Sequence, residues 1–212
     1  MVDLKSMNKR KKAEYIWDYY KLHIIGTIVV ICIIISTIHG QITKPNYVFT
    51  LTMLGNVMDT NKTTQLENQL TKVVVKDENS RKQARVDTIP TDGSKNANPQ
   101  TTGQYMQKFI AELSVGELDV VILNKSMFQT FIKENMFLRL DNISGLNLDY
   151  LKGAKLSATG SNKKTAVYAI DAKNIVILKN YGFDTKDKVI GIIGSTKQKY
   201  NSILVLKWLL SK

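Results

Sequence analysis

One uninterrupted apolar run dominates the hydropathy pattern near the start of the chain. The segment from Leu22 to Ile38 reads LHIIGTIVVICIIISTI and contains no formally charged residue over 17 positions. At 1.5 Å per residue, a helix of this length approaches the roughly 30 Å thickness of a hydrocarbon core. The pattern therefore predicts one transmembrane helix at residues 22–39, with a buried core helix as the alternative.

The residues that flank this run predict its direction. Basic side chains gather before it, as KRKK at 9–12 and at Lys21, whereas only Lys44 follows it closely. Lysine and arginine stay on the cytoplasmic side of a span, and aromatic rings such as those of YIWDYY at 15–20 favour the headgroup layer. Residues 1–21 are thus predicted to form a basic cytoplasmic juxtamembrane segment of a single-pass protein of the cell membrane.

A cleaved signal peptide is the rival interpretation of the same run. Cleavage needs small residues in an A-x-A-like pattern, whereas the chain reads STIHGQ at 36–41. A lipoprotein signal would need a small residue before its cysteine, but Ile31 precedes Cys32. We therefore expect an uncleaved anchor, a linker at 40–46 and an extracytoplasmic domain at 47–212.

Beyond the linker, strand-like and helix-like patterns alternate. β-branched and aromatic runs predict strands at 47–54, 84–89, 119–123, 166–170 and 189–193. Apolar residues at helical spacing predict helices at 59–76, 106–113, 126–136 and 199–210. Strands that alternate with helices imply crossover connections, so the expected fold class is α/β, a mainly parallel sheet with flanking helices.

Two local patterns add detail to these elements. Thr64 and Glu67 have the spacing of a capping box within the first predicted helix. The sequence TDGSKNANPQTTG at 91–103 predicts an exposed loop, because glycine, asparagine and proline interrupt regular structure.

Composition and charge limit the partners that we expect for the outer domain. The chain has 212 residues, 43% of them apolar and 23% charged, which suits one globular domain plus a smaller part. Residues 41–212 hold 24 basic and 15 acidic side chains, so the outer domain is basic in its own right. Without interleaved aromatics this basic surface does not predict nucleic-acid binding. Its targets are lipid headgroups or an acidic wall polymer, unless the lysines only maintain solubility.

The residue types in the outer domain predict no catalytic centre. His23, Cys32 and His39 all lie in or beside the apolar run, so residues 41–212 contain neither histidine nor cysteine. This excludes Ser-His-Asp and Cys-His catalysis, disulfides and the usual zinc sites there. GIIGSTK at 191–197 lacks the spacing of a phosphate-binding loop. Glu117 and Asp119 are interpreted as surface acids of a turn, so we expect no metal, cofactor or enzymatic activity.

Three segments carry a resemblance to a known fold. They are YVFTLTML at 47–54, FIAELSVGELDVVILNKSMFQTFIKENMFLRLD at 109–141 and VIGIIGSTKQKYNSILVLKWLL at 189–210. Their order resembles the type 2 periplasmic-binding fold of extracellular solute-binding proteins of ATP-driven importers, in which a helix ends in a Gly-Glu-hydrophobic-Asp turn. Here Gly116 could end that helix with a positive φ. About 25 residues separate Asp141 from Ala166, so the resemblance implies one lobe without the usual second.

The leading functional hypothesis is a non-enzymatic domain that binds a partner protein or a weak ligand at the cell surface. The alternative is the solute-binding component of an ATP-driven importer. Ligands of open α/β sheets sit beyond the carboxyl ends of the strands. Position alone therefore nominates Asn56, Asp92 and Asn124 as ligand-binding residues.

Overall fold

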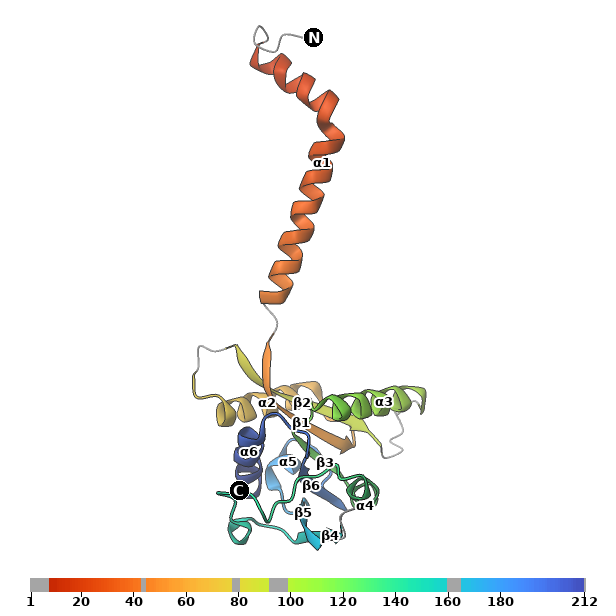
Figure 1. Cartoon of the computed structure of the whole chain (residues 1–212), viewed down its shortest axis with the longest axis vertical. Coiled ribbons are helices and arrows are strands. Elements are labelled where there is room, and N and C mark those ends of the chain that lie inside the picture. Colours follow the sequence, from red (N-terminus) through yellow and green to blue (C-terminus); the bar gives the residue numbers. More distant parts are fainter. Residues whose placement is uncertain (1–7, 43–44, 78–80, 92–98, 160–164, 212) are drawn as a thin grey trace. The chain divides into compact units, whose positions relative to one another are not determined.

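The computed structural model describes residues 8–42, 45–77, 81–91, 99–159 and 165–211. The chain divides into two compact units, Met1–Pro45 and Asn46–Lys212. Within the described residues, the first unit consists of one helix, α1 (Lys9–Ile42) (Figure 1). Its segment Trp17–His39 is long and apolar enough to cross a membrane. The most apolar stretch of this segment is not buried against other parts of the chain.

Helix α1 extends beyond the predicted span in both directions. The basic residues at 9–12 belong to the same helix as the apolar run. Lysine and arginine have high helix propensity, and no glycine or proline interrupts the segment between them and the apolar run. The predicted apolar helix is confirmed, and the basic segment before it is helical as well.

The second unit is built on a six-stranded sheet of order β2-β1-β3-β6-β5-β4. The strands are β1 (Asn46–Gly55), β2 (Lys82–Pro90), β3 (Val120–Asn124), β4 (Lys155–Thr159), β5 (Thr165–Asp171) and β6 (Lys188–Ile192). Strand β1 pairs in parallel with β2 and β3, whereas the β3-β6, β6-β5 and β5-β4 pairs are antiparallel. The α/β class is confirmed, but the prediction of a mainly parallel sheet is wrong.

The reason for this error lies in the second half of the unit. Strands β4 and β5 pair as neighbours in the chain, and β6 then enters beside β3 in the opposite direction. A short apolar run predicts a buried strand, but the direction of that strand depends on its pairing partner. Strand β4 had no counterpart in the prediction, because in its sequence KLSAT only Ala158 is buried.

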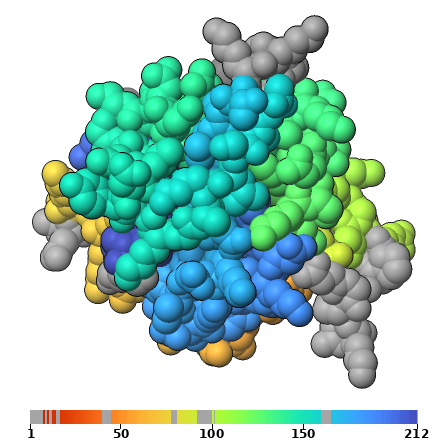
Figure 2. All heavy atoms as spheres, turned by 90° about the horizontal axis from the view of Figure 1, so that it is seen from below, coloured from red at the N-terminus to blue at the C-terminus, as the bar shows by residue number. Residues whose placement is uncertain are grey.

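Helices cover both faces of the sheet. They are α2 (Thr60–Val74), α3 (Pro99–Val115), α4 (Lys125–Lys133), α5 (Val176–Asn180) and α6 (Lys199–Ser211), with a 3₁₀ turn at Leu148–Tyr150. Buried residues of α2, α5 and α6 form one core with Leu51 and Met53 of β1. Buried residues of α3 and α4 form the second core with Val121 and Leu123 of β3. Figure 2 shows described residues between α4 and α5, at 134–159 and 165–175, in turquoise to blue, over one end of the unit.

Two helix starts differ from the prediction for local reasons. Helix α3 begins at Pro99, inside the predicted loop, since proline is well suited to the first turn of a helix. The N-cap of α2 is Asp59, whose carboxylate accepts hydrogen bonds from the backbone N–H groups of Asn61 and Lys62. The capping box predicted from Thr64 and Glu67 is therefore wrong.

Glu67 instead protects the edge of the sheet. Its Oε1 accepts a hydrogen bond from the Val86 N–H of β2 at 3.0 Å, and Thr71 Oγ1 accepts one from the Ala84 N–H at 2.9 Å. Strand β2 is an edge strand, and unpaired edge N–H groups invite pairing with other chains. Two side chains of α2 thus satisfy two donors on this edge.

Candidate functional site

The two ends of the central strands have different surroundings. At the first, called the amino edge, β1, β2 and β3 begin and β6 ends. Helix α6 also begins there, since Nδ2 of Asn201 donates a hydrogen bond to the Val48 carbonyl of β1 at 2.8 Å. At the opposite end, called the carboxyl edge, β3 ends beside the start of β6, where Asn124 pairs with Lys188.

The structure brings two of the three nominated residues to the carboxyl edge. Asn56 follows β1, and its side chain accepts a hydrogen bond from the Asp184 N–H and donates one to the Gly182 carbonyl, each at 2.8 Å. Asn124 ends β3 and accepts a hydrogen bond from Lys188 at 2.7 Å. Asp92 lies outside the described residues. Both asparagines thus make contacts within the domain, and their role in ligand binding stays a prediction.

Lys188 is a buried residue of the carboxyl edge that the sequence analysis missed. Its exposure is 1%, and its ammonium lies 5.7 Å from the centre of the Phe183 ring. A Cβ on Gly55 would lie 2.8 Å from the Lys188 nitrogen, so Gly55 leaves room for this side chain. A lysine at the start of an apolar strand is ordinarily exposed, and no local pattern distinguishes this one.

A cavity of about 320 Å³ opens at the amino edge. Its lining comes from β1, β2, the turn before β3 and the turn before α6. The lining residues are Tyr47, Thr50, Arg85, Gly116, Glu117, Asp119, Lys197 and Gln198. The cavity therefore presents charges of both signs together with hydroxyl, amide and aromatic groups.

Asp119 holds three segments of this cavity together. It is 3% exposed, so its interpretation as a surface acid is wrong. Its Oδ2 accepts a hydrogen bond from the Thr50 N–H at 2.8 Å, and its Oδ1 accepts one from the Thr196 hydroxyl. Burial raises the pKa of Asp119, while the hydrogen bonds from Thr196 and Thr50 act in the opposite direction. The Gly-Glu-Leu-Asp turn marked this residue, but its burial depends on segments distant in the chain.

Arg85 is the fixed positive charge of the cavity. Its guanidinium lies 2.5 Å from Asp87 and 2.8 Å from Glu112 of α3, and its central carbon is 5.7 Å from the centre of the Tyr47 ring. Burial alone would lower the pKa of Arg85, but the two carboxylates raise it above its ordinary value. Among the described residues, Nε of Arg85 is buried without a hydrogen-bond partner.

Gly116 shapes the turn between α3 and the buried Asp119. Its φ is +70°, as expected for a glycine that ends a helix, and a Cβ there would lie 2.6 Å from the Ser195 carbonyl oxygen. The turn before α6 thus approaches Gly116 too closely for any side chain.

We expect Gly116→Ala to lower the free energy of unfolding by more than the ~1–2 kcal/mol of a left-handed alanine, because it adds a backbone clash. Gly145→Ala is the matched control, since Gly145 has a φ of +79° and no other atom within 4 Å of its Cβ position. Urea unfolding of both variants in detergent, followed by circular dichroism, compares the two losses. Equal losses would show that the Ser195 contact is not tight.

The chemistry available to the cavity is recognition by hydrogen bonds and charge. No described residues form a group of three His, Cys, Asp or Glu side chains that could hold a metal ion. Pockets of roughly 300–1,000 Å³ are the usual size for small ligands. The cavity is at the lower end of this range and could receive a small polar molecule or one side chain of a partner.

Comparisons with known proteins do not identify a family for this chain. No protein-family model and no curated protein sequence matches the chain. One solved structure, an extracellular solute-binding protein family 1 from Alicyclobacillus acidocaldarius subsp. acidocaldarius DSM 446, is similar with a TM-score of 0.36 and 16% identity. The alignment covers 60% of this chain and 28% of that one. Because the TM-score and the sequence identity are both low, the resemblance to solute-binding proteins stays a prediction.

Proposed function

We propose that the chain is a non-enzymatic binding protein, anchored in the cell membrane by α1, whose domain at 46–212 faces the extracytoplasmic side. The cavity at the amino edge is the observation that carries this proposal. It combines fixed, buried groups with an open mouth, and it belongs to a chain whose first unit is an apolar helix of membrane-spanning length.

The lining of the cavity favours a ligand that carries both charges. Asp119 and Arg85 are held in place by their bonds to other segments. Glu117 and Lys197 are exposed at the same cavity and add one negative and one positive charge to it. A segment of a partner protein carries positive and negative side chains along its length, and its backbone adds hydrogen-bond donors and acceptors.

Photo-crosslinking in native membranes tests this proposal. A photoreactive amino acid in place of Glu117 should give a discrete protein adduct, because that side chain lies at the cavity. The same amino acid in place of Lys179 on α5 is the matched control and should give no such adduct. Identical products from both positions, or none from Glu117, would remove the cavity as the binding site.

The predicted ligand residues at the carboxyl edge are tested in the same assay. These residues lie at the edge opposite the cavity, so they matter only if the partner contacts both edges. In that case their alanine variants should lose the adduct while remaining folded, and unchanged recovery would show that partner binding does not depend on Asn56 and Asn124.

The importer alternative requires a soluble ligand. A domain that delivers a solute should gain thermal stability with one class of sugar, peptide or anion, since a ligand that binds only the folded state stabilises it. A stability gain with one class and no protein adduct would favour the importer component over the partner-binding protein.

A further inference from the structure

The amino edge carries a concentration of exposed basic side chains. We call this set the basic edge, and it consists of Lys72, Lys76, Arg81, Lys82, Lys197 and Lys199. Among the described residues of the same loops, the exposed acids are Asp77 and Glu117, while Asp119 is buried. Glu78 belongs to the same loop as Asp77 and lies outside the described residues. Even with Glu78 counted, these loops carry six positive charges against three negative ones outside the buried Asp119.

Topology brings these residues together from two distant parts of the chain. Helix α2 follows β1 at the carboxyl edge and ends at Val74, and β2 starts at Lys82, so Lys72 and residues 75–77 lie toward the amino edge. The Asn46 N–H donates a hydrogen bond to the Arg81 carbonyl at 3.0 Å, which places Arg81 beside the start of β1. The turn before α6 contributes Lys197 and Lys199, next to β1 through the bond between Asn201 and Val48.

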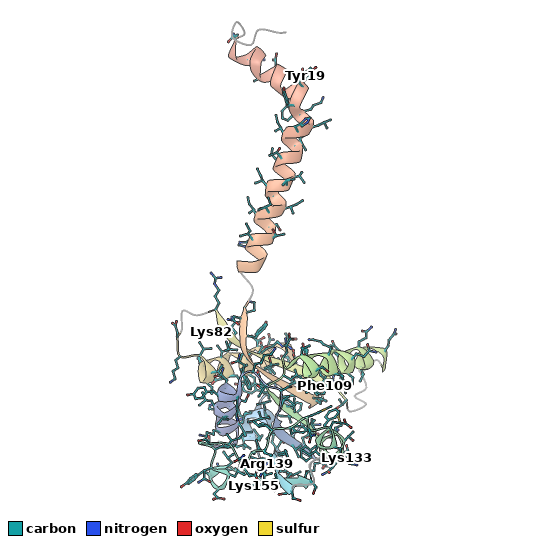
Figure 3. All side chains as sticks on the ribbon, in the orientation of Figure 1. Tyr19, Lys82, Phe109, Lys133, Arg139 and Lys155 are labelled. Atoms are coloured by element: carbon teal, nitrogen blue, oxygen red, sulfur yellow. The ribbon has the colours of Figure 1, made fainter. Side chains whose placement is uncertain are left out.

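Two exposed tyrosines belong to the same edge. Tyr47, the second residue of β1, is 46% exposed, and Tyr200, at the start of α6, is 66% exposed. Tyrosine is enriched where a protein surface meets lipid headgroups, because its ring is apolar and its hydroxyl is polar. Figure 3 labels Lys82 at this end of the domain and Lys133, Arg139 and Lys155 at the other end.

We propose that the basic edge rests on an anionic lipid surface. Clustered lysine and arginine side chains are attracted to anionic headgroups, and the attraction is confined to about a Debye length. The chain enters the domain at this edge, since Asn46 follows α1 after residues 43–45. This inference rests on the membrane anchoring in the proposed function. The cavity would then open toward the headgroup layer, within reach of a segment of another membrane protein.

The test uses the full chain in lipid nanodiscs with a spin label at one position of the edge. The label replaces Ser195, an exposed residue of the turn before α6, in a Cys32→Ser background; Cys32 is the only cysteine in the chain. Collision with a water-soluble relaxation reagent measures its exposure. We expect several-fold lower accessibility in discs that contain phosphatidylglycerol than in phosphatidylcholine discs, and high salt should restore it.

Charge-reversal variants identify the surface responsible. Replacing Lys76, Lys82, Lys197 and Lys199 by glutamate should abolish the protection of the label. Replacing Lys133, Lys152, Lys179 and Lys186, exposed lysines off the basic edge, by glutamate is the matched control and should leave the protection intact. Circular dichroism checks that both variants are folded.

Each of the following outcomes would overturn the inference. Equal accessibility in the two kinds of disc would show that anionic lipid does not contact the edge. Equal effects of the two variants would show that the charge acts non-specifically. Protection by a soluble teichoic acid in phosphatidylcholine discs, without protection in phosphatidylglycerol discs, would assign the edge to a wall polymer instead. Failure of the chain to enter nanodiscs at all would refute the anchor, whereas entry without protection would refute the lipid contact alone.

Discussion

Asp119→Ala is expected to lower the free energy of unfolding by about 3–5 kcal/mol, the larger of the two stability effects predicted for this domain. The substitution removes the acceptor for the Thr50 N–H and the Thr196 hydroxyl. Each buried donor left without a partner costs about 1–3 kcal/mol. Because these donors belong to β1 and to the turn before α6, the loss should also loosen the cavity.

Glu117→Ala is the matched control for this substitution. Glu117 lies two positions earlier in the same turn and lines the same cavity, but its side chain is exposed. We expect a change within about 0.5 kcal/mol, as for most surface substitutions. Urea unfolding of the full chain in detergent, followed by circular dichroism, measures both. A small loss for Asp119→Ala would show that water replaces the carboxylate as acceptor.

Removal of the chain from the membrane is the second large effect, and it is expected from Val30→Lys combined with Ile33→Lys. Each lysine near the centre of a span adds about 2.5–3.5 kcal/mol to the apparent free energy of insertion. Val30→Leu combined with Ile33→Leu is the matched control, because leucine keeps the span apolar. Membrane pellets washed with alkaline carbonate should retain the wild type and the leucine variant but not the lysine variant.

The direction of the span is tested with single cysteines in the Cys32→Ser background. A cysteine in place of Lys179 should react with a membrane-impermeant maleimide on intact cells. A cysteine in place of Asn8 should react only after lysis, because the basic N-terminus is predicted to be cytoplasmic. The reverse pattern would contradict the proposed location of the domain, and reaction of neither before lysis would place both on the cytoplasmic side.

Local patterns were sufficient for most of the elements. The predicted strands at 47–54, 84–89 and 119–123 correspond to β1, β2 and β3. Side-chain periodicity and β-propensity act over a few residues, so they can be read along the chain. Strand β4 could not be found in this way, because its sequence has little apolar character and its pairing with β5 defines it.

The candidate site was less accessible to prediction than the fold. Glu117 and Asp119 were singled out, but a spacing of two residues does not reveal that one is exposed and the other buried. Arg85 and Lys197 lie far from that turn in the chain, and the sheet and the start of α6 bring them to the same cavity. Charge pairs and cavities form between segments, and their members have no common local pattern.

The order of amino acids alone was enough to identify one apolar helix, a basic flank and an α/β domain without histidine or cysteine. These properties depend on composition and on short-range periodicity, which are present before the chain folds. The direction of β6, the burial of Asp119 and Lys188, and the joining of two basic loops at the amino edge were decided only by tertiary structure. They result from which strands pair and which helices cover them, and this depends on packing between residues far apart in the chain.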